Sequence, residues 1–186
     1  MQSKMKILVL GPSGVGKTVL SNIISDHSET PSSVYHPTAG VRILEFEKDP
    51  PRSNRRAGES AVNIELWDCS GDPRYEKCWN AFRKDAVGII FVYDAEDPNP
   101  DMNPWVRHFL MRMRIPTNQC IAMAHSKSSS SKKTSKPPMG LERIAIHETC
   151  LESSQNIRLA FEKLFGFLYS SLAETQEREE NELFKI

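Results

Sequence analysis

The sequence predicts an α/β domain with a mostly parallel sheet, because segments with strand character alternate along the chain with segments of helical periodicity. Residues 87–93 and 119–124 are almost continuously apolar, which is typical of strands buried on both faces of a parallel sheet. A glycine-rich stretch at 11–18 separates a short apolar run from a segment of helical spacing. Ligands of such sheets bind at the carboxyl ends of the strands, so we expect the functional site at that edge.

The same patterns assign the other elements. Strands are expected at 4–10, 41–47, 62–66, 87–93, 119–124 and 142–147, which makes a six-stranded sheet. Helices are expected at 16–27, 75–84, 102–114 and in a long last segment with one apolar face, formed by Ile157, Phe161, Leu164, Phe165, Leu168 and Leu172. We expect one domain over residues 1–173, followed by an acidic tail at 174–186 whose last residues are frayed.

Composition limits the function classes. The chain has 24 lysines plus arginines and 24 aspartates plus glutamates, so its net charge is zero. This argues against a general nucleic-acid binder, which would need a basic surface. No apolar run approaches the length of a membrane span. Four scattered cysteines without a C-x-x-C pair indicate reduced thiols and a cytosolic compartment. No cysteine follows Cys150 and the second residue is Gln2, so a lipid anchor is not expected either.

Residues 11–18, Gly-Pro-Ser-Gly-Val-Gly-Lys-Thr, match the phosphate-binding pattern G-x-x-x-x-G-K-[ST] between a strand and a helix. Backbone N–H groups of such a loop surround a phosphate chain, and here they would come from Gly11, Ser13, Gly14, Val15 and Gly16. Lys17 would reach the β- and γ-phosphates, and the Thr18 hydroxyl would bind Mg²⁺. The alternative is an ordinary glycine turn, which does not explain Lys-Thr at this offset.

Two further elements fit the same chemistry. Asp68-x-x-Gly71 closes the expected third strand, where the aspartate would join the Mg²⁺ shell indirectly and the glycine N–H would meet a γ-phosphate. Thr38 precedes the second strand and could bind Mg²⁺ through its hydroxyl and the γ-phosphate through its N–H. Each is weak alone, since turns often contain such residues, but all three elements occur together at suitable spacing.

Four segments carry a resemblance to a known family: 11–18, Tyr35-x-Pro-Thr38-x-Gly-Val41, Leu66-Trp67-Asp68-x-x-Gly71 and 85–95. With them, the chain resembles the Ras superfamily of small GTPases, and within it Rab most closely. The resemblance implies a P-loop NTPase small-GTPase fold that binds GTP or GDP with Mg²⁺, and Tyr35 joins the expected nucleotide contacts. The family's fourth flanking helix has no counterpart here. Its place is taken by residues 126–138, with six serines, four lysines and no acid, where we expect a mobile loop.

More narrowly, the chain is similar to Rab-like subunits of intraflagellar transport complex B, on the strength of 40–47, Trp67-Asp68-Cys69-x-Gly-Asp72, Cys78-Trp79 and Ala124-His125-x-Lys127. This likeness implies a protein of the cytoplasm and of the cilium or flagellum, including basal body and axoneme, monomeric on its own. It would dock onto coiled-coil subunits of that complex through the two switch segments, around Thr38 and from Asp68 to Phe82. The expected docking residues are Ile43, Phe46, Trp67, Tyr75 and Trp79, with Tyr75 and Trp79 exposed.

The chain departs from the family pattern at three functional positions. Asp72 stands where a glutamine usually orients the attacking water, so we name no catalytic residue and expect very slow hydrolysis. His125-Ser-Lys127-Ser replaces the guanine-binding Asn-Lys-x-Asp, and Cys150-Leu-Glu replaces the later Ser-Ala-Lys. His125 and Lys127 remain candidates for the base side, while guanine preference rests on the resemblance.

Two alternatives stay open beside a nucleotide-dependent binding subunit, and a third is disfavoured. One is a conventional cycling GTPase whose hydrolysis is assisted by a partner. Another is a scaffold with a vestigial nucleotide site. A nucleotide kinase is disfavoured, since its arginine-rich lid has no match except the early basic segment 52–56.

Overall fold

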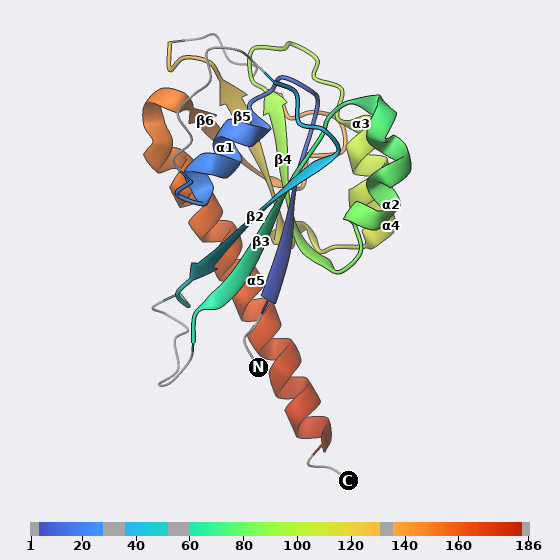
Figure 1. The fold of residues 1–186 in the computed structure, drawn as a ribbon, viewed down its shortest axis with the longest axis vertical. Coiled ribbons are helices and arrows are strands. Elements are labelled where there is room, and N and C mark those ends of the chain that lie inside the picture. Colours follow the sequence, from blue (N-terminus) through green and yellow to red (C-terminus); the bar gives the residue numbers. More distant parts are fainter. Residues whose placement is uncertain (1–3, 28–35, 52–59, 131–135, 184–186) are drawn as a thin grey trace.

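The structure is a computed structural model that describes residues 4–27, 36–51, 60–130 and 136–183. Six strands form one sheet (Figure 1): β1 (Lys4–Leu10), β2 (Val41–Lys48), β3 (Val62–Cys69), β4 (Ala86–Asp94), β5 (Cys120–Ser126) and β6 (Ala145–Cys150). The helical elements are α1 (Lys17–Ile24), η1 (Pro73–Cys78), α2 (Trp79–Phe82), α3 (Asn103–Trp105), η2 (Val106–Leu110), α4 (Met111–Met113), η3 (Thr117–Gln119), η4 (Leu151–Ser153) and α5 (Ser154–Leu183). The α/β fold expected from the sequence is confirmed.

The strand order is β2-β3-β1-β4-β5-β6, with β2 antiparallel to β3 and every other pair parallel. The sheet is therefore mostly parallel, as expected. The carboxyl ends of β1, β3, β4, β5 and β6 meet at one edge, which brings together loops that lie far apart in the sequence.

Each face of the sheet has its own apolar core. One core packs α1 and α5 on the sheet, with Leu20 and Phe165 as central members. The other packs α2, α3 and η2 on the opposite face, around Phe91 and Phe109. Side chains of the central strands alternate between the two cores, which is why β1, β4 and β5 are apolar along most of their length.

Several element boundaries differ from the sequence prediction. The sixth strand begins three residues later than expected and runs over 145–150, because residues 138–144 form turns whose Leu141 and Ile144 enter the second core. The helix expected at 75–84 is a 3-10 turn followed by one short α-helical turn. Asp72 caps that turn and Pro73 occupies its first position, so the chain begins to coil earlier than its apolar spacing predicts.

The last helix continues without a break from residue 154 to residue 183. The segment predicted as an acidic tail is thus helical over 174–183, and in Figure 1 its last turns extend beyond the sheet. Residues 184–186, expected to fray, lie outside the described residues. Within the described part of the insert at 126–138 no helix is present, and residues 131–135 also lie outside it.

No helix in the part of the chain that the structure describes has the length and apolarity of a membrane span. All four cysteines are free thiols, three of them buried and Cys78 exposed.

Candidate functional site

The loop at 11–18 joins the carboxyl end of β1 to α1, and its glycines are required by its shape. Gly11 has φ 148°, and a Cβ there would lie 1.9 Å from the carbonyl oxygen of Val92 on β4. Gly16 caps α1 in the left-handed conformation, with φ 94°. The loop therefore packs directly against the neighbouring strand and presents the start of α1 at the edge of the sheet, where an anion is favoured.

Lys17 lies across this loop. Its side chain is only 6% exposed, and its Nζ donates to the carbonyl oxygens of Gly11 at 2.9 Å and Pro12 at 2.6 Å. Burial lowers the pKa of Lys17 to about 8, while the negative charge of Asp68 acts in the opposite direction. An ammonium held in this way is partly desolvated and positioned for an anionic group next to the loop.

Asp68, at the end of β3, accepts from the two threonines predicted to bind Mg²⁺. Thr18 Oγ1 donates to Asp68 Oδ2 at 2.6 Å, and Thr38 Oγ1 lies 3.4 Å from the same atom. The two threonine hydroxyl oxygens are 2.9 Å apart. Three segments separated by 20 to 50 residues thus converge on one point beside the loop, as the sequence predicts.

The same residues fit a divalent cation. Asp68 is 0% exposed, and its Oδ1 has no hydrogen-bond partner among the described residues. Burial raises the pKa of Asp68, and the hydrogen bond from Thr18 is the largest opposing effect. A buried carboxylate oxygen without a partner is costly, and a hydrated Mg²⁺ bound by two hydroxyls and phosphate oxygens would satisfy it.

Gly71 and Asp72 follow on the second switch segment. A Cβ on Gly71 would lie 2.4 Å from backbone atoms of Gly11, Pro12 and Ser13, so this segment touches the phosphate loop and only glycine fits there. The Asp72 carboxylate is held by Arg74 through both oxygens: Oδ1 accepts from its backbone N at 2.9 Å, and Oδ2 accepts from Nε at 2.9 Å and Nη2 at 2.7 Å. These bonds lower the pKa of Asp72. Asp72 therefore caps η1 rather than facing the loop as a free anion.

On the base side, His125 occupies the end of β5. Its Nδ1 lies 3.1 Å from Thr149 Oγ1 on β6, and a Cβ on Gly16 would approach its ring to 2.8 Å. His125 thus links the phosphate loop to β6, and burial lowers its pKa. Lys127 is exposed, and its backbone N donates to Glu96 Oε1 at 3.1 Å. Tyr35 lies outside the described residues.

Comparison with known proteins agrees with this geometry. Residues 6–128 match the family model described as Roc, the Ras of Complex domain of DAPkinase. The chain is 37% identical over 182 residues to "Intraflagellar transport protein 22 homolog" of Danio rerio, spanning 95% of this chain and 96% of the relative. The Homo sapiens homolog is 36% identical over 183 residues, with the same coverage. The chain belongs to the intraflagellar transport protein 22 family. A relative from Trypanosoma brucei brucei, "Intraflagellar transport protein 22", is 30% identical and spans 94% of this chain and 90% of the relative.

In this member of the intraflagellar transport protein 22 family, part of the predicted docking set lies on one face of the sheet. Ile43 on β2 pairs directly with Trp67 on β3, and Ile43 is 44% exposed. The Trp67 ring is half-buried and carries Lys6 Nζ at 3.4 Å from its centroid, a close cation–π contact. Tyr75 was expected to be exposed, but it is half-buried, because its ring lies beside Gly40 of the first switch segment.

Two other predicted docking residues do not join this face. Trp79 was expected to be exposed, but it is 3% exposed and packs on Trp105, His108 and Phe109 in the second core. Its position on the inner side of the short helix α2 makes it a core residue. Phe46 lies three residues after Ile43 on a strand, hence on the opposite face, where it packs against Phe161 of α5.

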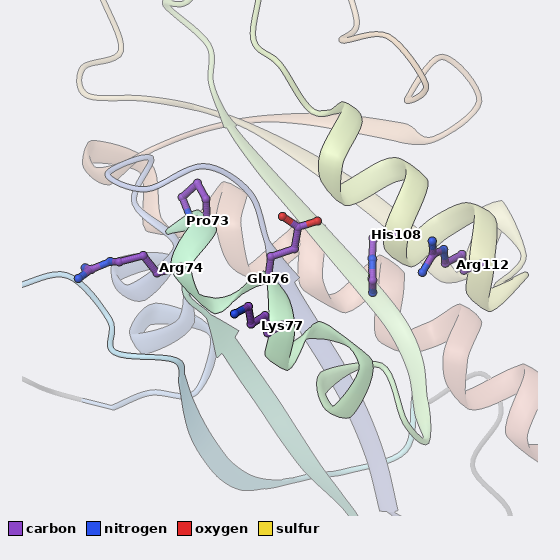
Figure 2. Close-up of a pocket in the computed structure, with 6 residues that line it drawn as sticks. All are labelled: Pro73, Arg74, Glu76, Lys77, His108 and Arg112. Carbon is purple, nitrogen blue, oxygen red and sulfur yellow. The ribbon is translucent and has the colours of Figure 1, made fainter.

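A shallow cavity of about 600 Å³ borders the second switch segment. It lies between η1, which contributes Pro73, Arg74, Glu76 and Lys77, and the helix of η2 and α4, which contributes His108 and Arg112. Figure 2 shows Arg74 directed away from His108 and Arg112, with Glu76 between the two elements. Sequence reasoning missed His108 and Arg112, because nothing local distinguishes them from solvent-facing residues of an amphipathic helix.

Proposed function

We propose that this chain is a GTP- and GDP-binding subunit of the intraflagellar transport machinery, whose nucleotide controls a protein-binding surface. The observation that carries the proposal is the convergence of Thr18, Thr38 and the buried Asp68 beside a complete phosphate loop. The printed names of the relatives supply the transport role. The finer assignment to complex B rests on the resemblance stated above.

Mg²⁺ would be bound by the hydroxyls of Thr18 and Thr38 and by phosphate oxygens, with Asp68 accepting from its water. Thr38 and Gly71 would then donate their backbone N–H groups to the γ-phosphate. Because these two residues belong to different switch segments, a γ-phosphate would bind both segments at once, and its loss would release them. GTP and GDP states thereby present different surfaces.

Hydrolysis would be very slow. Asp72 replaces the water-orienting glutamine, and its bonds to Arg74 direct it into the cap of η1. No positioned acceptor for the attacking water follows Gly71, which removes a contribution that phosphoryl transfer needs. Single-turnover hydrolysis measured with and without partner distinguishes this from a cycling GTPase, and a rate typical of small GTPases in the free protein would refute it. Replacing Asp72 by glutamine would not lower the rate.

Partners would dock on the face formed by Ile43, Trp67 and Tyr75. The exposed Ile43 beside the half-buried Trp67 would contact the apolar side of a helix. The expected partners are therefore coiled-coil subunits of the complex. The protein would be monomeric alone, and partners would carry it to the basal body and axoneme of the cilium or flagellum.

The proposal is tested first by identifying the nucleotide that denaturation releases from the purified protein. GTP or GDP is expected from the wild type and neither from Lys17→Ala. Release of no nucleotide, with equal stability of both proteins, would support the scaffold alternative instead.

Docking is tested by capture of the coiled-coil subunits. Ile43→Ala is expected to weaken capture by the GTP-loaded protein with little change in melting temperature, because Ile43 is 44% exposed. Phe167→Ala, which truncates an exposed side chain on α5, is the control. Equal capture by all three proteins would exclude this face.

A further inference from the structure

The base side of the nucleotide site lacks the usual acid on the loop after β5, where Ser128 stands in the aspartate position. β5 and β6 are adjacent and parallel, with Ser126 paired to Cys150 at their carboxyl ends. His125 Nδ1 lies 3.1 Å from Thr149 Oγ1, and Ser126 Oγ lies between the carbonyl oxygens of Ser128, at 3.0 Å, and Thr149, at 3.4 Å. The loop after β5 and the turn η4 after β6 are therefore held side by side.

Glu152, in η4, directs its carboxylate across this junction. Its Oε2 accepts from the backbone N of Ser129 at 3.2 Å and from the Ser129 hydroxyl, and its Oε1 accepts from Ser128 Oγ at 3.3 Å. The carboxylate thus lies next to the position from which the acid is missing. These bonds, led by the Ser129 hydroxyl, lower the pKa of Glu152, so the group is ionised at neutral pH.

We infer that Glu152 supplies the guanine-binding carboxylate of this site, from the loop after β6 instead of the loop after β5. The inference rests on the proposed function, since it assigns the base preference of the same nucleotide site. In the family pattern an acidic residue follows β5 and a lysine follows β6. In this chain Ser128 follows β5 and Glu152 follows β6, so the acidic residue is on the loop after β6 instead of the loop after β5.

The chemistry favours guanine over adenine. Guanine presents two donors, N1–H and the 2-amino group, on one edge, and an ionised carboxylate accepts both. Ser128 and Ser129 hold Glu152 through one oxygen each, and a carboxylate has about four acceptor positions, so capacity for the base remains. Adenine offers a lone pair at N1, which a carboxylate repels.

Glu96 provides a matched control. It is another carboxylate beside the loop after β5, but it follows β4 and accepts from the backbone N of Lys127 at 3.1 Å. A Glu-to-Gln change at either position removes one charge near the same loop. A nonspecific electrostatic effect would therefore be equal for the two variants, whereas base binding predicts a loss only at residue 152.

The experiment measures the affinities of the nucleotide-free protein for Mg²⁺ complexes of GDP, IDP, XDP and ADP by calorimetry. The wild type is expected to prefer GDP over IDP, which lacks the 2-amino group, and over ADP. Glu152→Gln is expected to lower GDP affinity about 10- to 100-fold, the range for lost charged hydrogen bonds. ADP affinity would stay unchanged, and XDP affinity would rise because an amide can donate to the 2-oxo group. Glu96→Gln should behave as wild type.

A second variant makes the test independent of folding. Ser128→Asp combined with Glu152→Gln returns the acid to the loop after β5 and is expected to restore the preference for GDP over ADP. An unchanged GDP-to-ADP ratio in Glu152→Gln, or the same loss in Glu96→Gln, would overturn the inference while leaving nucleotide binding intact. A wild type that binds none of the four nucleotides would overturn the proposed function and this inference with it.

Discussion

Replacing Asp68 by asparagine is expected to have opposite effects on the free and the nucleotide-bound protein. The side chain is fully buried with one oxygen unpartnered, and burial raises its pKa. A carboxyl with a raised pKa in the folded state is destabilising once it is ionised at neutral pH. Asparagine keeps the shape and an acceptor for Thr18 but removes the charge. The free protein should therefore melt at the same temperature or higher.

The bound protein should lose about half or more of its stabilisation by Mg²⁺–nucleotide. Ligand at 100 times its Kd stabilises the wild type by about 2.7 kcal/mol, or about 5–11 °C for a domain of this size. Loss of an outer-shell partner of a metal weakens binding about 10- to 100-fold. At the same ligand concentration the variant would then gain about 0.4–1.4 kcal/mol, a shift of about 1–6 °C.

The assay is thermal melting with and without GDP and Mg²⁺, repeated with EDTA. Asp101→Asn is the control, because it makes the same change at an exposed position whose carboxylate accepts from the backbone N of Asn103 and contacts neither threonine. EDTA should reduce the wild-type shift and leave the variant almost unaffected. A ligand shift in Asp68→Asn equal to that of the wild type would refute the Mg²⁺ assignment. A large fall in the melting temperature of the free variant would refute the reasoning about burial.

Two further predictions follow. The pKa of Lys17 is about 8 in the free protein, and an anionic phosphate would raise it. GDP affinity should therefore be constant below pH 8 and fall up to about tenfold per pH unit above it. Calorimetry from pH 7 to 9.5 measures this dependence, and an affinity that does not change with pH would contradict it. Trp79→Ala should cost about 3–5 kcal/mol, because the side chain is buried among Trp105, His108 and Phe109, and lower the melting temperature by about 6–20 °C. Tyr75→Ala, at a half-buried position, should lower it less, and equal shifts would mean that Trp79 is not the core residue described.

The sequence alone predicts the phosphate half of the candidate site. Residues 11–18 would act through their own backbone and the adjacent side chains of Lys17 and Thr18. The groups that would bind phosphate are therefore consecutive in the sequence, and a sequence pattern can identify them. Thr38 and Asp68 could be added because each lies at the start or end of a strand, and parallel strands bring such ends to one edge. The fold class followed from the same alternation of strands and helices.

Only the tertiary structure decided which side chains share a surface. The burial of Trp79 depends on how α2 packs against η2. The Asp72 carboxylate binds Arg74, two positions later, in a turn whose type the sequence did not predict. Phe46 was wrongly grouped with Ile43, although the period of two along a strand already separates them. Glu152 reaches Ser128 across 24 residues, because two parallel strands end together; no local pattern encodes that meeting.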